Sequence, residues 1–340
     1  MKLEKLNSQI KTGKLLPVYF FYGDEQYLLS RKTAAIVARL ITPGMEDFNR
    51  FYFEGKKTDL DAVIEAAEQF PQMSPKKVVI VKNSGFFHQT NTAVYRRIKE
   101  MVLDLPEYTC LIWIEEHFDK KKEKNVQFIE EYGGVVAFDY LPVNQLELWL
   151  EDRFRREEKQ IAPRDLTYMI RLCGPALGKI QTEYEKLLNY IGDRNKISRE
   201  DIDAVVDRTV EYRVYDMLDN ILTKKGGLAR EQMKYLKDSR EQPTVVMGLM
   251  MAKISELLTC RQLKETGMSA REIGEYFDFK RPLFAVNKTI EDSRRYDESY
   301  LISMLNKGLN YDADIKNGRM DGWTAAELYL AELTGLNDGK

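Results

Sequence analysis

The sequence predicts an α/β domain with a parallel sheet, followed by an all-helical region. Over about the first 140 residues, short apolar segments bounded by turn residues alternate with longer segments of helical periodicity. Strands that alternate with helices in this way form parallel sheets with helices on both faces. After Leu141-Pro142 the strand-like segments nearly stop, and helical periodicity continues to the end. The expected fold class is therefore α/β plus all-α.

The expected strands are short apolar segments, rich in β-branched or aromatic residues and flanked by turn residues. They are residues 17–23, 49–55, 76–83, 109–116 and 134–140. The spacing of apolar residues predicts helices over 25–41, 58–70 and 93–105. The second of these helices follows Thr58, a candidate N-cap, and carries Asp61 in its first turn.

The helical region divides further at its helix-breaking residues. Four short helices are expected in its first part, with breaks at Pro163, Gly174-Pro175 and Gly192-Asp193. From residue 209 onward the helical segments are longer. We therefore predict three domains, which are residues 1–141, 142–207 and 208–340, because a chain of 340 residues is too long for most single cores.

The composition is that of an ordinary globular protein. Hydrophobic residues make up 44% and charged residues 31%, and a net charge of −2 gives no sign of a protein that coats DNA. No apolar run approaches the roughly 20 residues of a membrane helix, and residues 1–14 lack a signal-peptide core. Cys110, Cys173 and Cys260 are too far apart for a disulfide framework or a metal cluster. We therefore expect a reduced, cytoplasmic protein.

Residues 18–29, VYFFYGDEQYLL, begin like a nucleotide-binding site, because an apolar strand enters a glycine before a helix. A phosphate-binding loop would continue with a second glycine, a lysine, and a serine or threonine that binds Mg²⁺. Here Asp24 and Glu25 follow Gly23, and their charge would repel phosphate but suits a helix N-terminus. We therefore expect helix capping at this position rather than nucleotide binding.

Other patterns for catalysis and metal binding are weak. Glu115 and Glu116 end a strand, as the magnesium-binding acids of ATPases do, but without a phosphate-binding lysine we interpret them as a solvated strand end. The two histidines, His88 and His117, lack metal-binding spacing. Cys110 lies in an apolar strand and is expected to be inert. The sequence therefore predicts no catalytic, nucleotide-binding or metal-binding residues, and no cofactor.

One segment, residues 68–83, has the features of a binding loop. Pro71 and Pro75 end a helix and stiffen the turn into the next strand. Met73 lies between them, and methionine adapts to irregular pockets and is common at binding surfaces. From residue type alone two interpretations stay open: Met73 projects from a rigid loop, or it folds back into the core.

Several segments, in this order and spacing, resemble the delta subunit family of the bacterial DNA polymerase III clamp loader. They are PVYFFYGDEQYLL (17–29), FPQMSPKKVVIVKN (70–83), GPALGKIQTEYEKLLNYIGDRNKISREDIDAVV (174–206), YRVYDMLDNIL (212–222) and DADIKNGRMDGW (312–323). No single segment is as diagnostic as a phosphate-binding loop. Their common order over about 320 residues carries the resemblance.

The resemblance implies an AAA+-like fold whose three parts match the predicted domains. These are a clamp-binding α/β domain without a phosphate-binding loop, a small helical lid, and a helical collar for oligomerisation. It also implies that the chain binds and opens the ring-shaped sliding clamp (the beta subunit) while sister subunits hydrolyse ATP. The implied partners are the clamp, the delta-prime and gamma or tau subunits of a heteropentamer, and primed DNA. The chain would then support processive replication within a DNA-directed DNA polymerase holoenzyme, with no catalytic site of its own.

The resemblance also points to particular residues. The family inserts a Leu-Phe pair into an apolar pocket of the clamp, and the matching positions are Gln72 and Met73. Gln72 departs from this pattern because it lacks the apolar area of the leucine. Either the clamp pocket compensates for that loss, or Phe70 and Met73 are the anchors. In the collar, Lys316 and Arg319 are candidate DNA contacts, with helix-end capping as the alternative.

Two other functions remain to be weighed against clamp binding. The first is an active AAA+ ATPase that acts on DNA, which the missing lysine loop disfavours. The second is a standalone nucleic-acid-binding protein, which the net charge of −2 disfavours.

Overall fold

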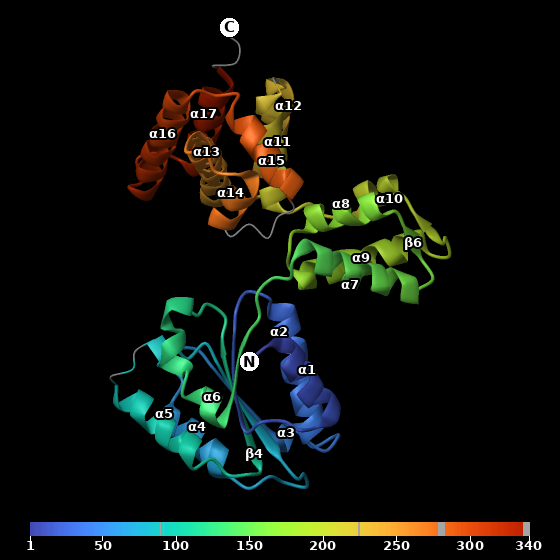
Figure 1. Ribbon diagram of the computed structural model, residues 1–340, viewed down its shortest axis with the longest axis vertical. Helices are drawn as coiled ribbons and strands as arrows, with labels where there is room; N and C mark the ends of the chain where they lie inside the picture. The colour runs from blue at the N-terminus through green and yellow to red at the C-terminus, as the bar shows by residue number, and fades with distance from the viewer. Residues whose placement is uncertain (89, 91, 224, 278–282, 336–340) are drawn as a thin grey trace. The chain divides into compact units, whose positions relative to one another are not determined.

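The computed structural model describes residues 1–88, 90, 92–223, 225–277 and 283–335. Two compact units are present (Figure 1). The first comprises Met1–Leu141 together with Ala176–Gly178, and the second comprises Pro142–Pro175 and Lys179–Lys340. The division of the helical region into two domains stays a prediction.

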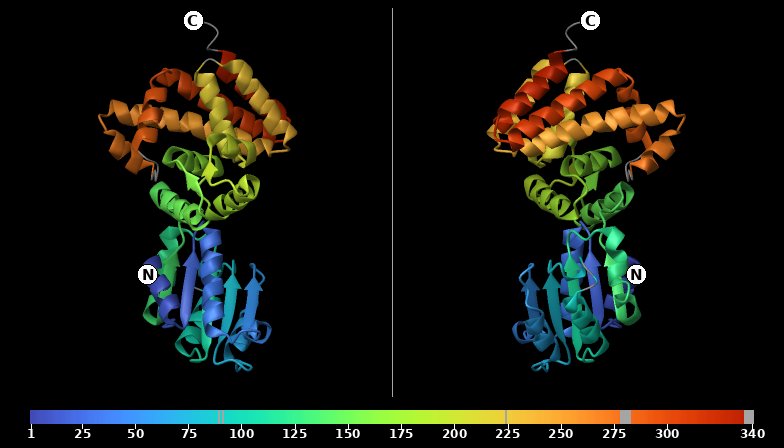
Figure 2. Two further views of the ribbon diagram at one scale, coloured as in Figure 1. Left: turned by 90° about the vertical axis from the view of Figure 1, so that its right-hand side faces the viewer. Right: turned by 90° about the vertical axis from the view of Figure 1, so that its left-hand side faces the viewer.

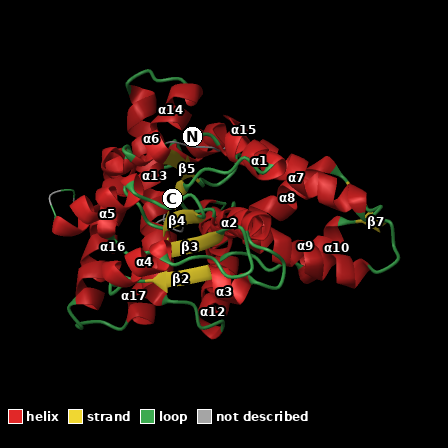
Figure 3. Cartoon of the chain, turned by 90° about the horizontal axis from the view of Figure 1, so that it is seen from below, coloured by secondary structure: helices red, strands yellow, loops and turns green. Residues whose placement is uncertain are grey.

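The first unit is built on a parallel five-stranded sheet. Its strands are β1 (Val18–Tyr22), β2 (Arg50–Glu54), β3 (Lys77–Lys82), β4 (Thr109–Glu115) and β5 (Gly133–Ala137). Their order is β2-β3-β4-β1-β5, and each neighbouring pair is parallel (Figures 2 and 3). The predicted fold class is confirmed, and each of the five expected strands corresponds to an observed one.

Helices cover both faces of this sheet. Successive side chains of a strand point to opposite faces, and in β1 both sets are buried. Phe20 of β1 belongs to the core that the sheet forms with α4 (Leu60–Glu68) and α5 (Ala93–Leu103). Tyr19 and Phe21 belong to the core on the other face, with α1 (Leu3–Thr12) and α2 (Gln26–Leu40). The shorter elements are α3 (Glu46–Asn49), α6 (Ile129–Tyr132), η1 (Phe86–His88) and η2 (Lys120–Val126).

The start of α4 differs from the expectation. Its N-cap is Asp59, whose side chain accepts a hydrogen bond from the backbone N–H of Asp61. The hydroxyl of Thr58 instead donates to the carbonyl of Gly55, 2.7 Å away. Thr58 as the N-cap is therefore wrong, because its hydroxyl closes the turn after β2 rather than binding the helix.

The second unit begins with the four short helices that the sequence predicts. They are α7 (Val143–Arg156), α8 (Pro163–Cys173), α9 (Leu177–Ile191) and α10 (Arg199–Val205), and only the first two residues of α9 belong to the first unit. A small parallel sheet of β6 (Gln160–Ile161) and β7 (Lys196–Ile197) joins two of the connections. The sequence analysis missed this sheet because two residues carry no measurable periodicity.

Further helices follow along the chain. They are α11 (Val210–Leu222), α12 (Gly226–Asp238), α13 (Pro243–Glu265), α14 (Ala270–Tyr276), α15 (Leu283–Ser293), α16 (Glu298–Lys316) and α17 (Gly322–Gly335). The longest among them are α13 and α16, with 23 and 19 residues. By length and composition α13 is apolar enough to cross a membrane. Its apolar residues are used in packing, since Val246, Met250 and Leu257 are buried in the core formed with α11, α16 and α17.

Candidate functional site

The turn between β1 and α2, where a nucleotide phosphate would bind, is closed by the chain itself. Gly23 has a φ of +123°, and a Cβ at this position would lie 2.4 Å from the carbonyl oxygen of Phe138. The same oxygen accepts a hydrogen bond of 2.8 Å from the backbone N–H of Glu25. The glycine is therefore required by the close approach of the Phe138 backbone.

Glu25 occupies the N-terminus of α2. Its side chain is 1% exposed and accepts a hydrogen bond from the N–H of Leu28, which confirms the expected helix cap. Its second oxygen accepts from the N–H of Leu177, 2.9 Å away, a residue that belongs to the same compact unit. A carboxylate of the chain itself thus lies at the N-terminus of α2, where helices commonly bind phosphate, and it accepts from one of the N–H groups there.

The acidic pair at the end of β4 is also used within the protein. Glu115 is buried and accepts from the Ser84 hydroxyl at 3.1 Å and from the Gly85 N–H at 2.8 Å, and its burial raises its pKa. Glu116 lies 2.8 Å from Lys82, whose hydrogen bond lowers the pKa of Glu116. The interpretation of a solvated strand end is therefore wrong for Glu115, which braces the loop after β3.

No other chemical centre is evident in the described part of the chain. It contains no group of three or more His, Cys, Asp or Glu residues placed to hold a metal ion. Cys110, Cys173 and Cys260 are buried, and burial raises the pKa of Cys110 and of Cys173 to about 12. These two thiols are therefore protonated at neutral pH and are poor nucleophiles.

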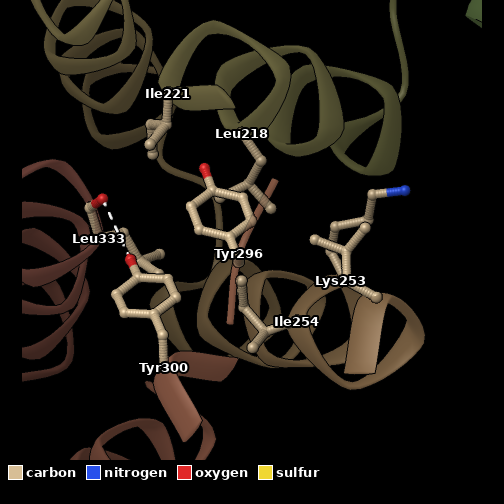
Figure 4. A pocket seen from close by; sticks show the side chains of 8 residues that line it. Leu218, Ile221, Lys253, Ile254, Tyr296, Tyr300 and Leu333 are labelled. Carbon is tan, nitrogen blue, oxygen red and sulfur yellow. Dashed lines mark hydrogen bonds between the residues drawn. The ribbon is translucent and has the colours of Figure 1, made fainter. Parts of the chain in front are cut away.

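A cavity among the helices of the second unit is too small for a ligand. It measures about 20 Å³ and is lined by aliphatic and tyrosine side chains with Lys253 at its rim (Figure 4). The Tyr300 hydroxyl donates to the carbonyl of Leu333 rather than pointing into free space (Figure 4). A cavity of this size holds about one water molecule.

At the end of the sheet where the parallel strands begin, residues 70–75 form an exposed turn that we call the tip loop. It connects the end of α4 to the start of β3, so it lies where the parallel strands begin, away from Gly23. The side chain of Phe70 is 79% exposed and that of Met73 is 83% exposed. Gln72 is exposed as well. Of the two interpretations of Met73, the structure therefore excludes burial in the core.

The backbone of the tip loop is held by Asn49, the last residue of α3. The side-chain amide of Asn49 donates to the carbonyl of Gln72 at 2.8 Å and accepts from the N–H of Gln72 at 2.8 Å. It also donates to the carbonyl of Met45 at 2.9 Å. Asn49 is fully buried, so these bonds are shielded from water. The side chain thus pairs with Gln72 as a neighbouring strand would.

A second contact fixes the other end of the tip loop. The hydroxyl of Ser74 accepts from the backbone N–H of Thr42 at 3.1 Å and donates to the carbonyl of Lys76 at 2.9 Å. Between these two anchored residues Met73 has a φ of +51°, a conformation that is uncommon for any residue other than glycine. The contacts on both sides therefore hold Met73 in a strained backbone conformation.

The helix that enters the tip loop is capped by side chains rather than by a glycine. Helices end with four carbonyl groups that lack partners within the helix. Here Lys77 donates to the carbonyl of Ala66 at 2.5 Å and also to that of Gln69. The hydroxyls of Thr109 and Tyr108 donate to the next two carbonyls, those of Ala67 at 2.8 Å and Glu68 at 2.7 Å. Four successive carbonyls at the end of α4 are therefore bound.

Lys77 is the most unusual member of this cap because its whole side chain is buried. Its ammonium lies 5.6 Å from the ring centres of Phe51 and of Tyr108. Burial lowers the pKa of Lys77 to about 8. The ring of Tyr108 also packs against Phe70, with centroids 5.0 Å apart, so one face of the exposed Phe70 ring is supported.

The candidate DNA contacts lie in the second unit at the end of α16. Lys316 is 2.6 Å from Asp312, one helical turn earlier, and Arg319 is 3.7 Å from Asp314. Both basic side chains are largely exposed. Exposed pairs of this kind are weak, so they leave both side chains available to another partner.

Comparison with known proteins identifies the family. A model of the DNA polymerase III delta subunit matches residues 19–138, and a model of the C-terminal domain of the same subunit matches residues 211–333. The DNA polymerase III subunit delta of Bacillus subtilis is 25% identical over 338 residues, which cover 97% of this chain and 96% of that protein. A probable DNA polymerase III subunit delta of Aquifex aeolicus is 19% identical and covers 74% of this chain.

A solved structure agrees with this assignment at the level of the fold. The Bacillus subtilis DNA clamp loader delta protein superimposes with a TM-score of 0.61 at 23% identity, and the match covers 98% of this chain and 99% of that one. The two family matches follow one another along the chain in the order expected for one protein. The chain therefore belongs to the DNA polymerase III delta subunit family, a component of the clamp loader.

Proposed function

We propose that this chain binds the sliding clamp through Phe70, Gln72 and Met73 of the tip loop and thereby opens the clamp ring. The observation that carries the proposal is the exposure of two large apolar side chains, Phe70 and Met73, on a loop whose backbone is fixed by buried hydrogen bonds. Single exposed apolar residues are common, but two on one rigid tip are typical of an interaction site.

The rigidity of the tip loop favours tight binding. A loop that is already ordered loses little conformational entropy when it docks. Phe70 and Met73 can then serve as anchors that enter an apolar pocket, the usual arrangement of an interface hot spot. Gln72 contributes through its backbone, which is the part that Asn49 holds. This arrangement supports the second of the two alternatives for Gln72, in which Phe70 and Met73 are the anchors.

Opening the ring requires no bond to be made or broken by this chain. A subunit that binds the open clamp more tightly than the closed clamp shifts the equilibrium toward the open form by that difference in affinity. The position where AAA+ ATPases bind phosphate is filled here by Glu25, so the energy of ATP hydrolysis would come from the sister subunits.

Membership of the clamp loader implies further partners. We propose that residues 208–340 contact the delta-prime and gamma or tau subunits, and that Lys316 and Arg319 contact the phosphate backbone of primed DNA. As a bacterial replication protein the chain is expected to work inside the cell, in the cytoplasm.

The proposal is tested by measuring binding to the sliding clamp of the same organism with surface plasmon resonance. Phe70→Ala and Met73→Ala should each weaken binding clearly, and Gln72→Ala should weaken it little. Leu103→Ala is the matched control, because Leu103 is an exposed apolar residue of the same unit on α5. Equal affinities for all four variants and the wild type would contradict the proposed contact.

A further inference from the structure

We propose that Asn49 and Lys77 are positioning residues for clamp binding, which hold the tip loop in the one conformation that presents Phe70 and Met73 together. This inference rests on the proposed function. It concerns two buried polar residues, neither of which lies in the tip loop itself.

Asn49 acts on the residue next to Met73. Its amide satisfies both backbone groups of Gln72 and uses its remaining hydrogen on Met45. Other side chains of similar size cannot supply a donor and an acceptor in this arrangement. Without these bonds the strained φ of Met73 has less to oppose its relaxation, and the side chain would sample other directions.

Lys77 acts on the residue next to Phe70. Its ammonium donates to the carbonyl of Gln69, and it has a second bond to Ala66 one turn earlier. The positive charge is also favourable at a helix C-terminus, where the dipole is negative. Pro71 has no N–H with which to continue the helix, and side chains bind the last carbonyls of α4 instead, with Lys77 on Ala66 and Gln69 and Thr109 on Ala67.

The two anchors therefore bracket the apolar residues. Lys77 fixes Gln69, just before Phe70, and Asn49 fixes Gln72, just before Met73. Burying a full ammonium is unfavourable, and an aliphatic residue could fill the same space between the rings of Phe51 and Tyr108. A requirement for one loop geometry explains why a lysine is buried here.

The competing explanation is that Asn49 and Lys77 only stabilise the fold. The two roles predict different effects on clamp affinity when Asn49 is substituted in a chain that already lacks the Met73 side chain. A residue that acts by placing Met73 loses much of its effect once Met73 is gone, whereas a residue that only stabilises the fold changes clamp affinity in neither background.

The experiment measures the dissociation constant of the full-length chain for the purified sliding clamp, well below the melting temperature of every variant. Asn49→Ala and Lys77→Met should each weaken binding about 5- to 100-fold, since each breaks buried hydrogen bonds of the loop or its entry helix. In a chain that carries Met73→Ala, the further effect of Asn49→Ala should shrink by at least about threefold.

A matched control and a milder variant keep the result interpretable. Asn125→Ala removes a bond of the same kind, from the side-chain amide to the carbonyl of Phe87, far along the chain from the tip loop, and should leave clamp affinity unchanged. Tyr108→Phe removes only the hydroxyl that binds the Glu68 carbonyl. It should weaken binding slightly, and it replaces Lys77→Met as the test of the helix cap if that variant does not fold.

The outcomes separate this inference from the proposed function. Weaker binding by Phe70→Ala and Met73→Ala, with unchanged binding by Asn49→Ala and Lys77→Met, would overturn only the positioning roles. Strictly additive effects of Asn49→Ala and Met73→Ala would overturn the positioning of Met73 by Asn49. Loss of the Phe70 and Met73 effects themselves would overturn the proposed function and this inference with it.

Discussion

The ammonium of Lys77 lies 2.5 Å from the carbonyl oxygen of Ala66, at the end of α4 and in a fully buried position. A buried charge at a helix end is a compromise, because the helix dipole favours it and desolvation opposes it. Here desolvation is the larger effect, and it lowers the pKa of Lys77 to about 8.

This lowered pKa predicts a pH dependence of stability. Between about pH 8, the pKa of Lys77 in the folded chain, and 10.5, the ordinary pKa of a lysine, the unfolded chain holds a proton that the folded chain has released. The free energy of unfolding contributed by Lys77 should therefore rise with pH in this window and be flat below it. Urea unfolding of the wild type and of Lys77→Met at pH 7, 9 and 10 isolates this contribution as a difference. A difference that is constant or falls with pH would show that Lys77 is not buried as a charged group.

Met73 should separate stability from binding. Because its φ is +51°, Met73→Gly removes backbone strain and should leave the free energy of unfolding unchanged or slightly higher. The same variant removes an anchor and should weaken clamp binding by about 1–3 kcal/mol, or roughly 5- to 150-fold. Met73→Phe should preserve or tighten binding. Calorimetric melting and clamp affinity measured on the same samples check both, and a large loss of stability in Met73→Gly would argue against the strained turn.

The chain should not bind ATP. The Glu25 carboxylate lies at the N-terminus of α2, and the Gly-Lys-Ser/Thr sequence of a phosphate-binding loop does not follow Gly23. Isothermal titration with Mg·ATP should show no saturable heat up to millimolar nucleotide. Glu25→Gln removes the charge but supplies no cation, so it should not create binding either. Micromolar affinity in the wild type would favour the ATPase alternative.

The predicted three domains can be tested with fragments. Residues 1–207 should fold and bind the clamp, because they contain the tip loop and the elements that hold it. Residues 208–340 should fold as a helical domain and bind the sister subunits without binding the clamp. Removal of 208–340 should abolish loader assembly, which size-exclusion chromatography of the reconstituted complex would reveal. Clamp capture by the C-terminal fragment would place the contact elsewhere.

The sequence was sufficient for much of the fold because strands and helices are specified locally. The apolar runs that became β1 and β4, and the acidic residue that caps α2, lie in the segments that they control. The two prolines predicted a stiff turn, but the residue types alone left open whether Met73 is exposed or buried. The roles of Asn49 and Lys77 in holding the loop could not be predicted. Asn49 binds a residue 23 positions away, and Lys77 is one of two consecutive lysines before a strand, a pattern that gives no sign of burial. The same long-range pairing explains the error at Glu115, which is bound by residues of the neighbouring strand connection.

The carboxylate of Glu25 at the start of α2 has a consequence for how such a subunit is controlled. An anion that is covalently part of the chain has a fixed effective concentration and cannot be exchanged or hydrolysed. On the prediction that the chain binds no ATP, the α/β unit would have no nucleotide-bound and nucleotide-free forms at this position. Its affinity for a partner would then not depend on a bound nucleotide, and we expect the timing of a loading cycle to be set by neighbouring subunits that do exchange their ligands.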